Sequence, residues 1–328
     1  MDREAGVALS RRALLVAVAG GGALVGCGSR RVPERSGVTS SPISASISPS
    51  ASPPAGPSDS PAATDTASPF GISSTEPSGT PSAAPSAETP TAPPEPTRAE
   101  VVARYRGLAP SAWGMEIAGV TTRLPAGERA TALTFDACGG PGGNGYDADL
   151  IDFLRAHDVP ATLFLNARWI DANPDVFDEL AAEPLFEIGN HGTVHRPLSV
   201  AGRSAYGIAG TGSVGEVYDE VVGNAHKLTG LLGRPPRFFR SGTAHYDDIA
   251  TRVVADLGER VAGFTVNGDG GATMSAAEVR EEVASAPPGS IVICHMNHPG
   301  GGTAPGVVAA VPGLLAAGRR FVRLSDVL

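Results

Sequence analysis

Ionisable and amide side chains follow several short apolar runs of this sequence, each near the point where a run ends. In chain order these residues are Asp136, Asn190, His191, His195, Arg240, Asn267, Asp269 and His295. In parallel α/β folds the carboxyl ends of the strands meet at one rim, where functional groups gather. A structural protein has no reason to place such a set there. The sequence therefore predicts one polar functional site.

His191 and His195 are four residues apart. On a helical turn, residues at this spacing share a face, so two imidazoles can bind one metal ion. The alternative is a pair of unrelated surface histidines. Their position at a strand end, beside other polar residues, favours a metal site.

Apolar runs and amphipathic segments alternate from about residue 130 onward. Strands are expected at residues 130–135, 160–166, 184–190, 237–242, 261–267, 290–295 and 320–325. Helices are expected at 146–157, from Asn173-Pro174 onward, and at 214–232, 247–257, 276–286 and 307–317. About seven strands separated by helices predict an α/β fold with a parallel sheet. The successive β/α units favour a distorted (β/α) barrel over an open, doubly wound sheet.

The chain before residue 130 has a different composition. Residues 28–98 are dominated by Ser, Pro, Thr, Ala and Gly. Such a segment cannot bury enough apolar surface to offset the entropy of ordering it, so a disordered linker is predicted. Residues 99–129 do not fit the β/α repeat and are expected to form an N-terminal extension. The catalytic domain is expected at 130–328.

Residues 1–27 have the layout of an export signal. Arg11 and Arg12 precede an apolar run that is too short to span a bilayer comfortably, and small residues follow up to Cys27. "SRRALL" resembles a twin-arginine signal. "LVGC" resembles a bacterial lipobox, which implies a lipid on Cys27; the alternative is a plain secretory signal with a chance cysteine. We expect an exported protein, anchored by lipid at the outer face of the cytoplasmic membrane.

Charge argues against nucleic acid as a partner. The formal net charge is −9, and Lys227 is the only lysine. A nucleic-acid-binding protein carries a basic patch or stripe, which this sequence lacks. The same deficit argues against attachment to a membrane through a polybasic segment.

Two cysteines remain after Cys27, at Cys138 and Cys294. They are too few for a fold built on disulfides. Three interpretations stay open: two buried thiols, a disulfide between them, or Cys138 as a metal ligand. Because side chains alternate along a strand, Cys294 is expected to face away from a site that contains His295.

Four motifs, "LTFDAC", "GNHGTVH", "FFRSG" and "IVICH", occur in this order. They resemble the motifs of the polysaccharide deacetylase, or NodB-homology, family, over about residues 130–328. The resemblance implies a distorted (β/α) barrel, a divalent metal ion that is usually zinc, and hydrolysis of acetyl groups from amino sugars or other glycans.

The same resemblance implies a role for each matching residue. Asp136 corresponds to the general base, and Arg240 to the arginine that pairs with the base. His295 corresponds to the general acid, and Asp269 to the acidic residue that supports it. His191 and His195 correspond to the metal-binding pair.

One residue departs from the family pattern. The first motif of the family has two adjacent aspartates, of which the second binds the metal, and here that position is Ala137. A water molecule or Asp136 itself are candidates for the missing ligand. The other candidates are His245, Asp247, Asp269, His298 and Cys138.

The leading hypothesis is a zinc-dependent deacetylase of peptidoglycan, a chitin-like polymer or an exopolysaccharide. A second is a degenerate barrel that binds glycan without catalysis, which Ala137 favours. A third is a metal hydrolase of the same fold that acts on a small amide. Only Trp113 and Trp169 offer indole rings on which a sugar could stack.

Overall fold

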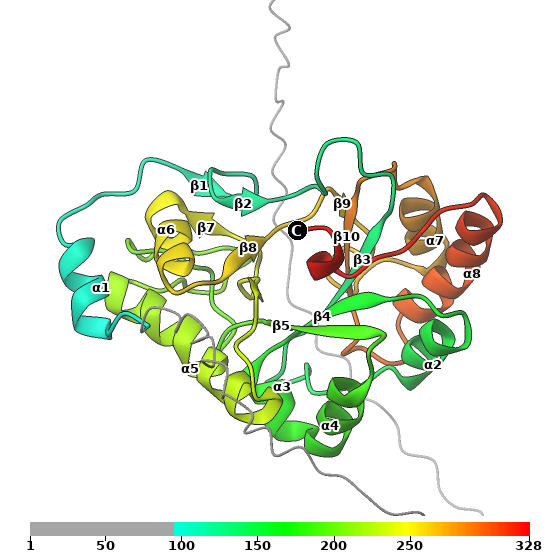
Figure 1. Ribbon diagram of the computed structural model, residues 1–328, viewed down its shortest axis with the longest axis horizontal. Helices are drawn as coiled ribbons and strands as arrows, with labels where there is room; N and C mark the ends of the chain where they lie inside the picture. Colours follow the sequence, from blue (N-terminus) through cyan, green and yellow to red (C-terminus); the bar gives the residue numbers. More distant parts are fainter. Residues whose placement is uncertain (1–94) are drawn as a thin grey trace, which may run out of the picture. The chain divides into compact units, whose positions relative to one another are not determined.

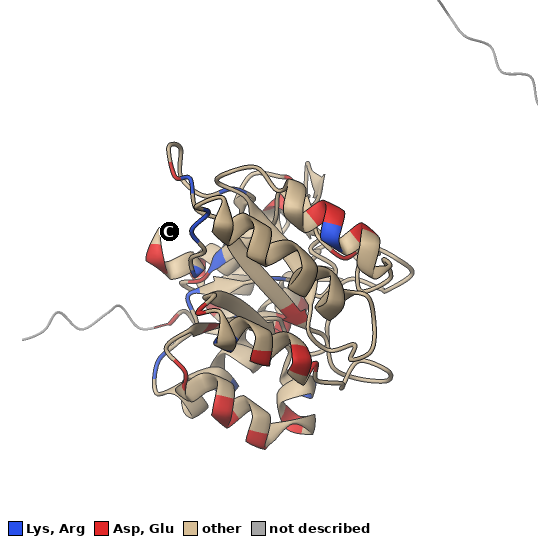
Figure 2. Cartoon of the chain, turned by 90° about the vertical axis from the view of Figure 1, so that its right-hand side faces the viewer, with Lys and Arg blue, Asp and Glu red and all other residues tan. Residues whose placement is uncertain are grey.

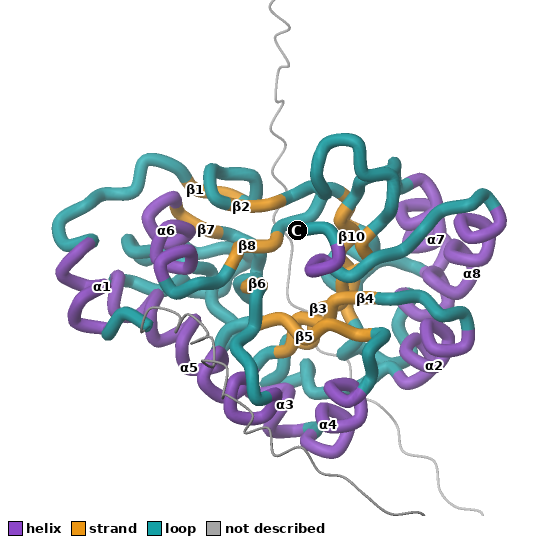
Figure 3. The backbone as a smooth tube through the Cα atoms, in the orientation of Figure 1, coloured by secondary structure: helices purple, strands orange, loops and turns teal. Residues whose placement is uncertain are grey.

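The computed structural model describes residues 95–328. The predicted export signal, the lipidation site Cys27 and nearly all of the predicted linker lie outside these residues. Within them, an eight-stranded, wholly parallel sheet curls through the centre (Figures 1 and 3). Its strands, in spatial order, are β2 (Val120–Thr121), β8 (Arg260–Ala262), β6 (Phe238–Phe239), β5 (Phe186–Asn190), β4 (Ala161–Leu165), β3 (Ala132–Ala137), β10 (Ile291–His295) and β9 (Val266–Asn267).

The connection between β8 and β9 brings the two edges of the sheet together. Gly263 donates its backbone N–H to the carbonyl of Thr121, the last residue of β2, at 2.8 Å. Two residues later, Thr265 donates its backbone N–H to Ile291 of β10, also at 2.8 Å. The predicted distorted (β/α) barrel is therefore confirmed, as a curled sheet that this connection nearly closes.

Helices surround the outer side of the sheet (Figure 1). They are α1 (Arg98–Arg104), α2 (Ala148–Ala156), α3 (Ala167–Ala172), α4 (Pro174–Ala182), α5 (Val214–Leu232), α6 (Asp248–Asp256), α7 (Ala276–Ser285) and α8 (Thr303–Ala316). Side-chain caps start several of them, as when Ser213 accepts the N–H of Glu216 in α5. The same helix ends at Gly233, whose φ of 69° suits glycine.

Strands β3 and β4 are buried on both faces. They therefore read as continuous apolar runs instead of alternating ones. Leu133, Phe135 and Ala137 lie in the apolar cluster that includes residues of α2 and α8. Thr134 and Asp136, on the opposite face of β3, contact Arg240 inside the curled sheet.

Two predicted strands differ from the structure. The segment 261–267 is broken at Gly263 into β8 and β9. The strand predicted at 320–325 is wrong: Phe321 forms a single bridge to Thr131, and a 3₁₀ helix, η1, follows at Leu324–Asp326. Strand β3 is paired on one side by β4 and on the other by β10, so it has no free edge for another strand.

The residues predicted as an extension, 99–129, build part of the barrel. Helix α1 packs against α5, and β2 pairs with β8 at one edge of the sheet. Strand β1 (Trp113–Gly114) pairs antiparallel with β7 (Tyr246–Asp247). These contacts cover an edge that would otherwise expose unpaired backbone groups.

Acidic residues outnumber basic ones on the face drawn in Figure 2, and no basic stripe crosses it. None of the helices among residues 95–328 has the length and apolarity needed to cross a membrane.

Candidate functional site

The structure brings the predicted site residues to one end of the curled sheet. Asp136 lies near the end of β3, His191 directly after β5, and His295 at the end of β10. A cavity of about 460 Å³ opens there, and Asp136, His195 and His295 line it together with Cys138.

Asp136 forms a buried ion pair with Arg240. The Asp136 Oδ1 atom accepts from Nη1 of Arg240 at 2.7 Å, and the arginine side chain is wholly buried. The guanidinium also donates to the hydroxyl of Thr134 and to the carbonyl oxygens of Ala262 and Gly263, at 2.9–3.1 Å. Every charge in this pair therefore has fixed partners, which is the condition for burying an ion pair.

The electrostatics of this pair keep the carboxylate ionised. Burial alone would raise the pKa of Asp136, but the positive charge of Arg240, with smaller contributions from His191 and His295, holds the pKa below its ordinary value. Asp136 can therefore accept a proton at neutral pH.

His295 is paired with Asp269. Its Nδ1 atom donates to Asp269 Oδ1 at 3.0 Å, and its backbone N–H donates to Oδ2 at 2.6 Å. The hydroxyl of Thr303 donates to the same carboxylate at 2.9 Å. Burial lowers the pKa of His295, but Asp269, aided by Cys138, outweighs this effect and raises the pKa well above its ordinary value. With Nδ1 committed to Asp269, Nε2 is the nitrogen free to exchange a proton.

His191 has a defined tautomer. Its Nδ1 atom lies 2.9 Å from the carbonyl oxygen of Arg240 and must donate to it. In the neutral ring, Nε2 is then an acceptor. Nε2 lies 3.6 Å from Asp136 Oδ2 and 3.8 Å from Cys138 Sγ. It can therefore offer its lone pair to a metal ion.

His195 reaches the site from a loop, whereas the sequence spacing suggested a helical turn. Its φ is 66°, and Gly192, three residues earlier, has a φ of 77°. Its ring centroid lies 5.0 Å from that of His191. The buried Nε2 atom of His195 has no hydrogen-bond partner among residues 95–328. An unpartnered imidazole nitrogen beside a second imidazole fits a metal ligand.

Cys138 completes a cluster with the two histidines. One ligand atom from each of Cys138, His191 and His195 lies within 4.8 Å of the others. Burial alone would raise the pKa of the Cys138 thiol, but the neighbouring histidines, His191 first, hold it well below its ordinary value. A lowered pKa favours the thiolate, which is the form that binds a metal ion.

Cys294, the other cysteine among residues 95–328, is not part of this cluster. Cys294 is buried in the apolar core, and both cysteines are free thiols, so the disulfide considered from the sequence is absent. Cys294 also faces away from the cavity that His295 lines, as strand alternation predicts.

The remaining ligand candidates have other contacts. Asp247 caps α6 and accepts from Val200, and Asp269 holds His295. His245 donates from Nδ1 to the carbonyl oxygen of Thr243. Its ring centroid is 5.2 Å from that of Tyr206. His298 lines the cavity but is not part of the three-residue cluster.

Two supporting residues were missed in the sequence. Asn166 donates to the carbonyls of His191 and Gly192 at 2.9 and 2.8 Å. Asn166 is the last residue of the strand predicted at 160–166. Polar residues at the carboxyl ends of parallel strands were expected to form the site, so its position in the sequence could have identified it. Glu220 accepts from the N–H groups of Val194 and Arg196, on either side of His195. Glu220 could have been identified in the sequence because it is an acidic residue on the buried face of the helix predicted at 214–232.

The two tryptophans occupy different environments. Trp169 is buried and donates from Nε1 to the carbonyl of Gly145, so it cannot stack on a sugar. Trp113 is half-buried beside His245. Tyr206, which is 75% exposed, lines the cavity and presents the most accessible aromatic ring there.

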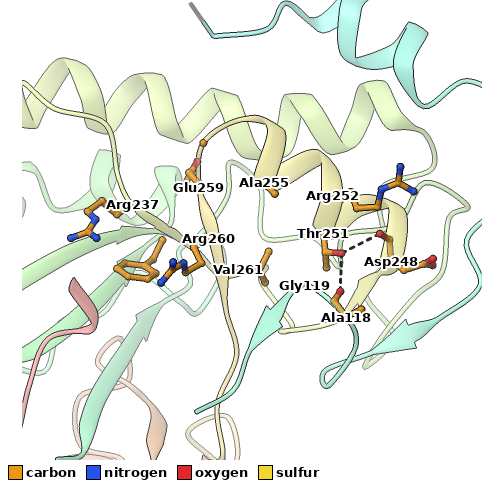
Figure 4. A pocket seen from close by; sticks show the side chains of 12 residues that line it. Ala118, Gly119, Arg237, Asp248, Thr251, Arg252, Ala255, Glu259, Arg260 and Val261 are labelled. Carbon is orange, nitrogen blue, oxygen red and sulfur yellow. Dashed lines mark hydrogen bonds between the residues drawn. The ribbon is translucent and has the colours of Figure 1, made fainter. Parts of the chain in front are cut away.

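A larger cavity, of about 620 Å³, begins at the opposite end of β8 (Figure 4). Arg237, Arg252 and Glu259 line it, and the Thr251 hydroxyl contacts the carbonyls of Ala118 and Asp248. It contains none of the predicted site residues.

Part of the chain is similar to known proteins. Residues 123–262 match the family model described as polysaccharide deacetylase. A chitooligosaccharide deacetylase from Bradyrhizobium sp. is 28% identical over 180 residues, which are 53% of this chain and 74% of that protein. The chain is therefore similar to polysaccharide deacetylases over residues 123–262, which are less than half of its length. The matched range includes Asp136, both histidines of the cluster and Arg240, and it ends before Asp269.

Other relatives are more distant. A 30.6 kDa uncharacterized protein from Geobacillus stearothermophilus is 29% identical over 98 residues, or 29% of this chain; the chain spans only 34% of that relative. Among solved structures, a CE4 family pseudoenzyme from Bacillus anthracis has a TM-score of 0.54 at 20% identity, covering 67% of this chain and 69% of its own. A peptidoglycan N-acetylglucosamine deacetylase, Bc1960, has a TM-score of 0.53 at 23% identity. The match covers 64% of this chain and 92% of that protein. These structures share the fold.

Proposed function

We propose that this protein is a metal-dependent deacetylase that removes acetyl groups from an extracellular polysaccharide containing amino sugars. One observation carries the proposal: an ionised carboxylate, Asp136, and a histidine of raised pKa, His295, line the same cavity. Two titratable groups whose pKa values are pushed apart are the mark of a base and an acid.

The donor set fits a divalent metal ion, for which we propose zinc. His191 offers Nε2 because its Nδ1 donates to a carbonyl, and Nε2 of His195 has no hydrogen-bond partner in the described part of the chain. A zinc ion held there would polarise the acetyl carbonyl and lower the pKa of water.

The protein's own groups then handle the protons. Arg240 fixes Oδ1 of Asp136, so Oδ2 is free to take a proton from the attacking water. His295 gives a proton from Nε2 to the departing amine. Asp269 holds the ring in place through Nδ1 and stabilises its charged form.

The substrate class is supported by the cavity and by the relatives. A volume of about 460 Å³ lies within the usual range of ligand pockets. Tyr206 offers an exposed aromatic ring at the cavity, and the Bradyrhizobium relative is a chitooligosaccharide deacetylase. We therefore propose N-acetylated glycans such as peptidoglycan, a chitin-like polymer or an exopolysaccharide.

We further propose that the protein acts outside the cell, held by a lipid on Cys27. The support is the sequence alone: a charged pair, an apolar run and "LVGC".

A second candidate function is glycan binding without catalysis. Ala137 favours it, and one relative by fold is described as a pseudoenzyme. The retained base, acid and their two supporting partners oppose it, because a protein that only binds glycan has no use for them.

Acetate release distinguishes the two functions. The full chain, loaded with zinc, is incubated with N-acetylglucosamine oligomers and with peptidoglycan. We expect release of acetate that falls on addition of a chelator and returns with zinc. Binding of either glycan with no acetate released, at full zinc occupancy, would favour the non-catalytic function.

A further inference from the structure

We propose that the sulfur of Cys138 is the third protein ligand of the metal ion, in place of the carboxylate that Ala137 lacks. The site then has a two-histidine, one-thiolate donor set. This inference rests on the metal dependence proposed above, and it adds the identity of a ligand and the class of metal preferred.

The alternation of side chains along β3 explains why residue 138 can serve and residue 137 cannot. Asp136 faces the cavity, and Ala137 lies wholly buried in the apolar cluster on the other face. Residues i and i+2 point to the same side of an extended chain. Cys138 therefore returns to the cavity side, where it is found.

The loop after Cys138 holds it against the site. Gly139 and Gly140 have φ values of 68° and 79°, which turn the chain sharply. A side chain on Gly139 would collide with the backbone N of Trp169 at 2.5 Å, so the turn is packed tightly on α3. Arg168 donates to the Cys138 carbonyl at 3.3 Å. The sulfur is thus positioned by packed backbone.

The distance between the Cys138 sulfur and the His191 nitrogen matches a metal site. With a zinc–sulfur bond of about 2.3 Å and a zinc–nitrogen bond of about 2.05 Å, tetrahedral geometry separates sulfur and nitrogen by about 3.6 Å. Cys138 Sγ lies 3.8 Å from Nε2 of His191. The buried Nε2 of His195, which has no hydrogen-bond partner within residues 95–328, independently fits a metal ligand beside this pair.

A thiolate changes which metals the site prefers. Sulfur and imidazole ligands favour zinc and cobalt, whereas magnesium and manganese prefer oxygen ligands. With Cys138 as the ligand, Asp136 is available as the base, because Arg240 holds its Oδ1 and leaves Oδ2 to accept a proton.

Cobalt spectroscopy tests the inference directly. The full chain carrying Cys27→Ser is loaded with Co²⁺, and the same background is made with Cys138→Ser or with Cys294→Ser as a matched control. We expect a near-ultraviolet thiolate-to-cobalt charge-transfer band in the parent and in C294S, and its loss in C138S. Zinc affinity in C138S should fall by more than the roughly 10–100-fold typical of outer-shell changes.

A second measurement needs no substitution at Cys138. In the parent, zinc should protect one thiol from alkylation, and a chelator should expose it, with Cys138 identified by peptide mapping. A bound cobalt ion without the charge-transfer band, or alkylation unaffected by zinc, would overturn the inference.

The outcomes separate this inference from the proposed function. If C138S binds zinc as the parent does and still releases acetate, the ligand assignment fails and the deacetylase stands. If the band appears but no glycan loses acetate, the ligand stands and the proposed function fails.

Discussion

Asp136 and His295 owe their opposite protonation states to their partners. Asp136 is buried and His295 is partly buried, and desolvation alone favours the neutral form of each. Arg240 reverses that effect for the aspartate and Asp269 reverses it for the histidine, through ion pairs at 2.7 and 3.0 Å. At this scale the site consists of two buried pairs that hold one base and one acid ready at the same pH.

Asp136→Asn should abolish acetate release while zinc remains bound. The amide cannot accept the proton of the attacking water, and removal of a general base typically costs about 10²–10⁴-fold in rate. The cluster of Cys138, His191 and His195 is unchanged. Zinc stoichiometry and acetate release are measured on the same sample, after thermal unfolding has shown that the variant folds. Loss of zinc would instead make Asp136 a ligand.

Asp269→Asn should move the alkaline limb of the pH–rate profile to lower pH. The folded-state pKa of His295 is raised mainly by the hydrogen bond and charge of Asp269. As an acid, His295 acts below its pKa, so its contribution is lost as pH rises through that value. Without the carboxylate of Asp269, the pKa of His295 is lower, so its contribution as an acid is lost at a lower pH. The acid limb, which belongs to Asp136, should stay in place, and an unchanged alkaline limb would exclude His295 as the acid.

The sequence predicted the two pairs and both histidines of the cluster, and it left Cys138 as one of several candidates for the third ligand. Asp136, Arg240, Asp269 and His295 lie at strand ends, where position along the chain determines position in space. His195 and Cys138 lie on loops. Their directions depend on positive φ values at His195 and Gly139 and on packing against other elements, which no periodic pattern records.

At the scale of elements, local signals predicted the helices well. Helix α5 runs from Val214 to Leu232, as its apolar spacing, Ser213 cap and Gly233 indicate. The strands were harder to predict, because a strand forms only where a neighbouring strand is available for hydrogen bonding. Residues 320–325 have strand-like composition, but β3 has no edge left for them. The break at Gly263 follows from bonds to both β2 and β10, which are far away in sequence.

Glu259, just before β8, should make the fold less stable as pH rises. Burial raises its pKa well above the ordinary value, although Asn190 donates to its Oε1 at 2.9 Å. Above the ordinary value the unfolded chain has released this proton while the folded protein still binds it. Stability therefore declines with rising pH, up to the folded-state pKa.

Glu259→Gln should remove that decline. The amide keeps an acceptor for Asn190 but has no proton to lose. The melting temperatures of the parent and E259Q are compared between about pH 5 and pH 8, a window that starts above the ordinary glutamate pKa. The parent should lose more stability across this window than the variant. Exposed Glu282, on α7, gives the matched control E282Q, which should follow the parent. Parallel slopes for all three proteins would contradict the assignment.

At the scale of the whole molecule, the proposed lipid anchor at Cys27 is tested by where the protein is found in the cell. Cys27→Ala should move the full chain from the membrane fraction to the soluble extracytoplasmic fraction, because the proposed lipid is its only predicted anchor. Melting temperature and zinc content should not change. Fractionation with immunodetection measures the distribution, and a variant that stays with the membrane would refute the lipoprotein.

The order of strands in the sheet also divides the site in two. Strands β3 to β6 and their loops supply Asp136, Arg240 and the three-residue cluster, all before residue 241. The acid pair arrives only with β9 and β10, and Asp136 meets His295 across the β3–β10 seam. Strand β10 lies between β3 and β9 and brings His295 opposite Asp136. A chain without β10 in place would therefore keep the proposed metal ligands but lack the proposed acid.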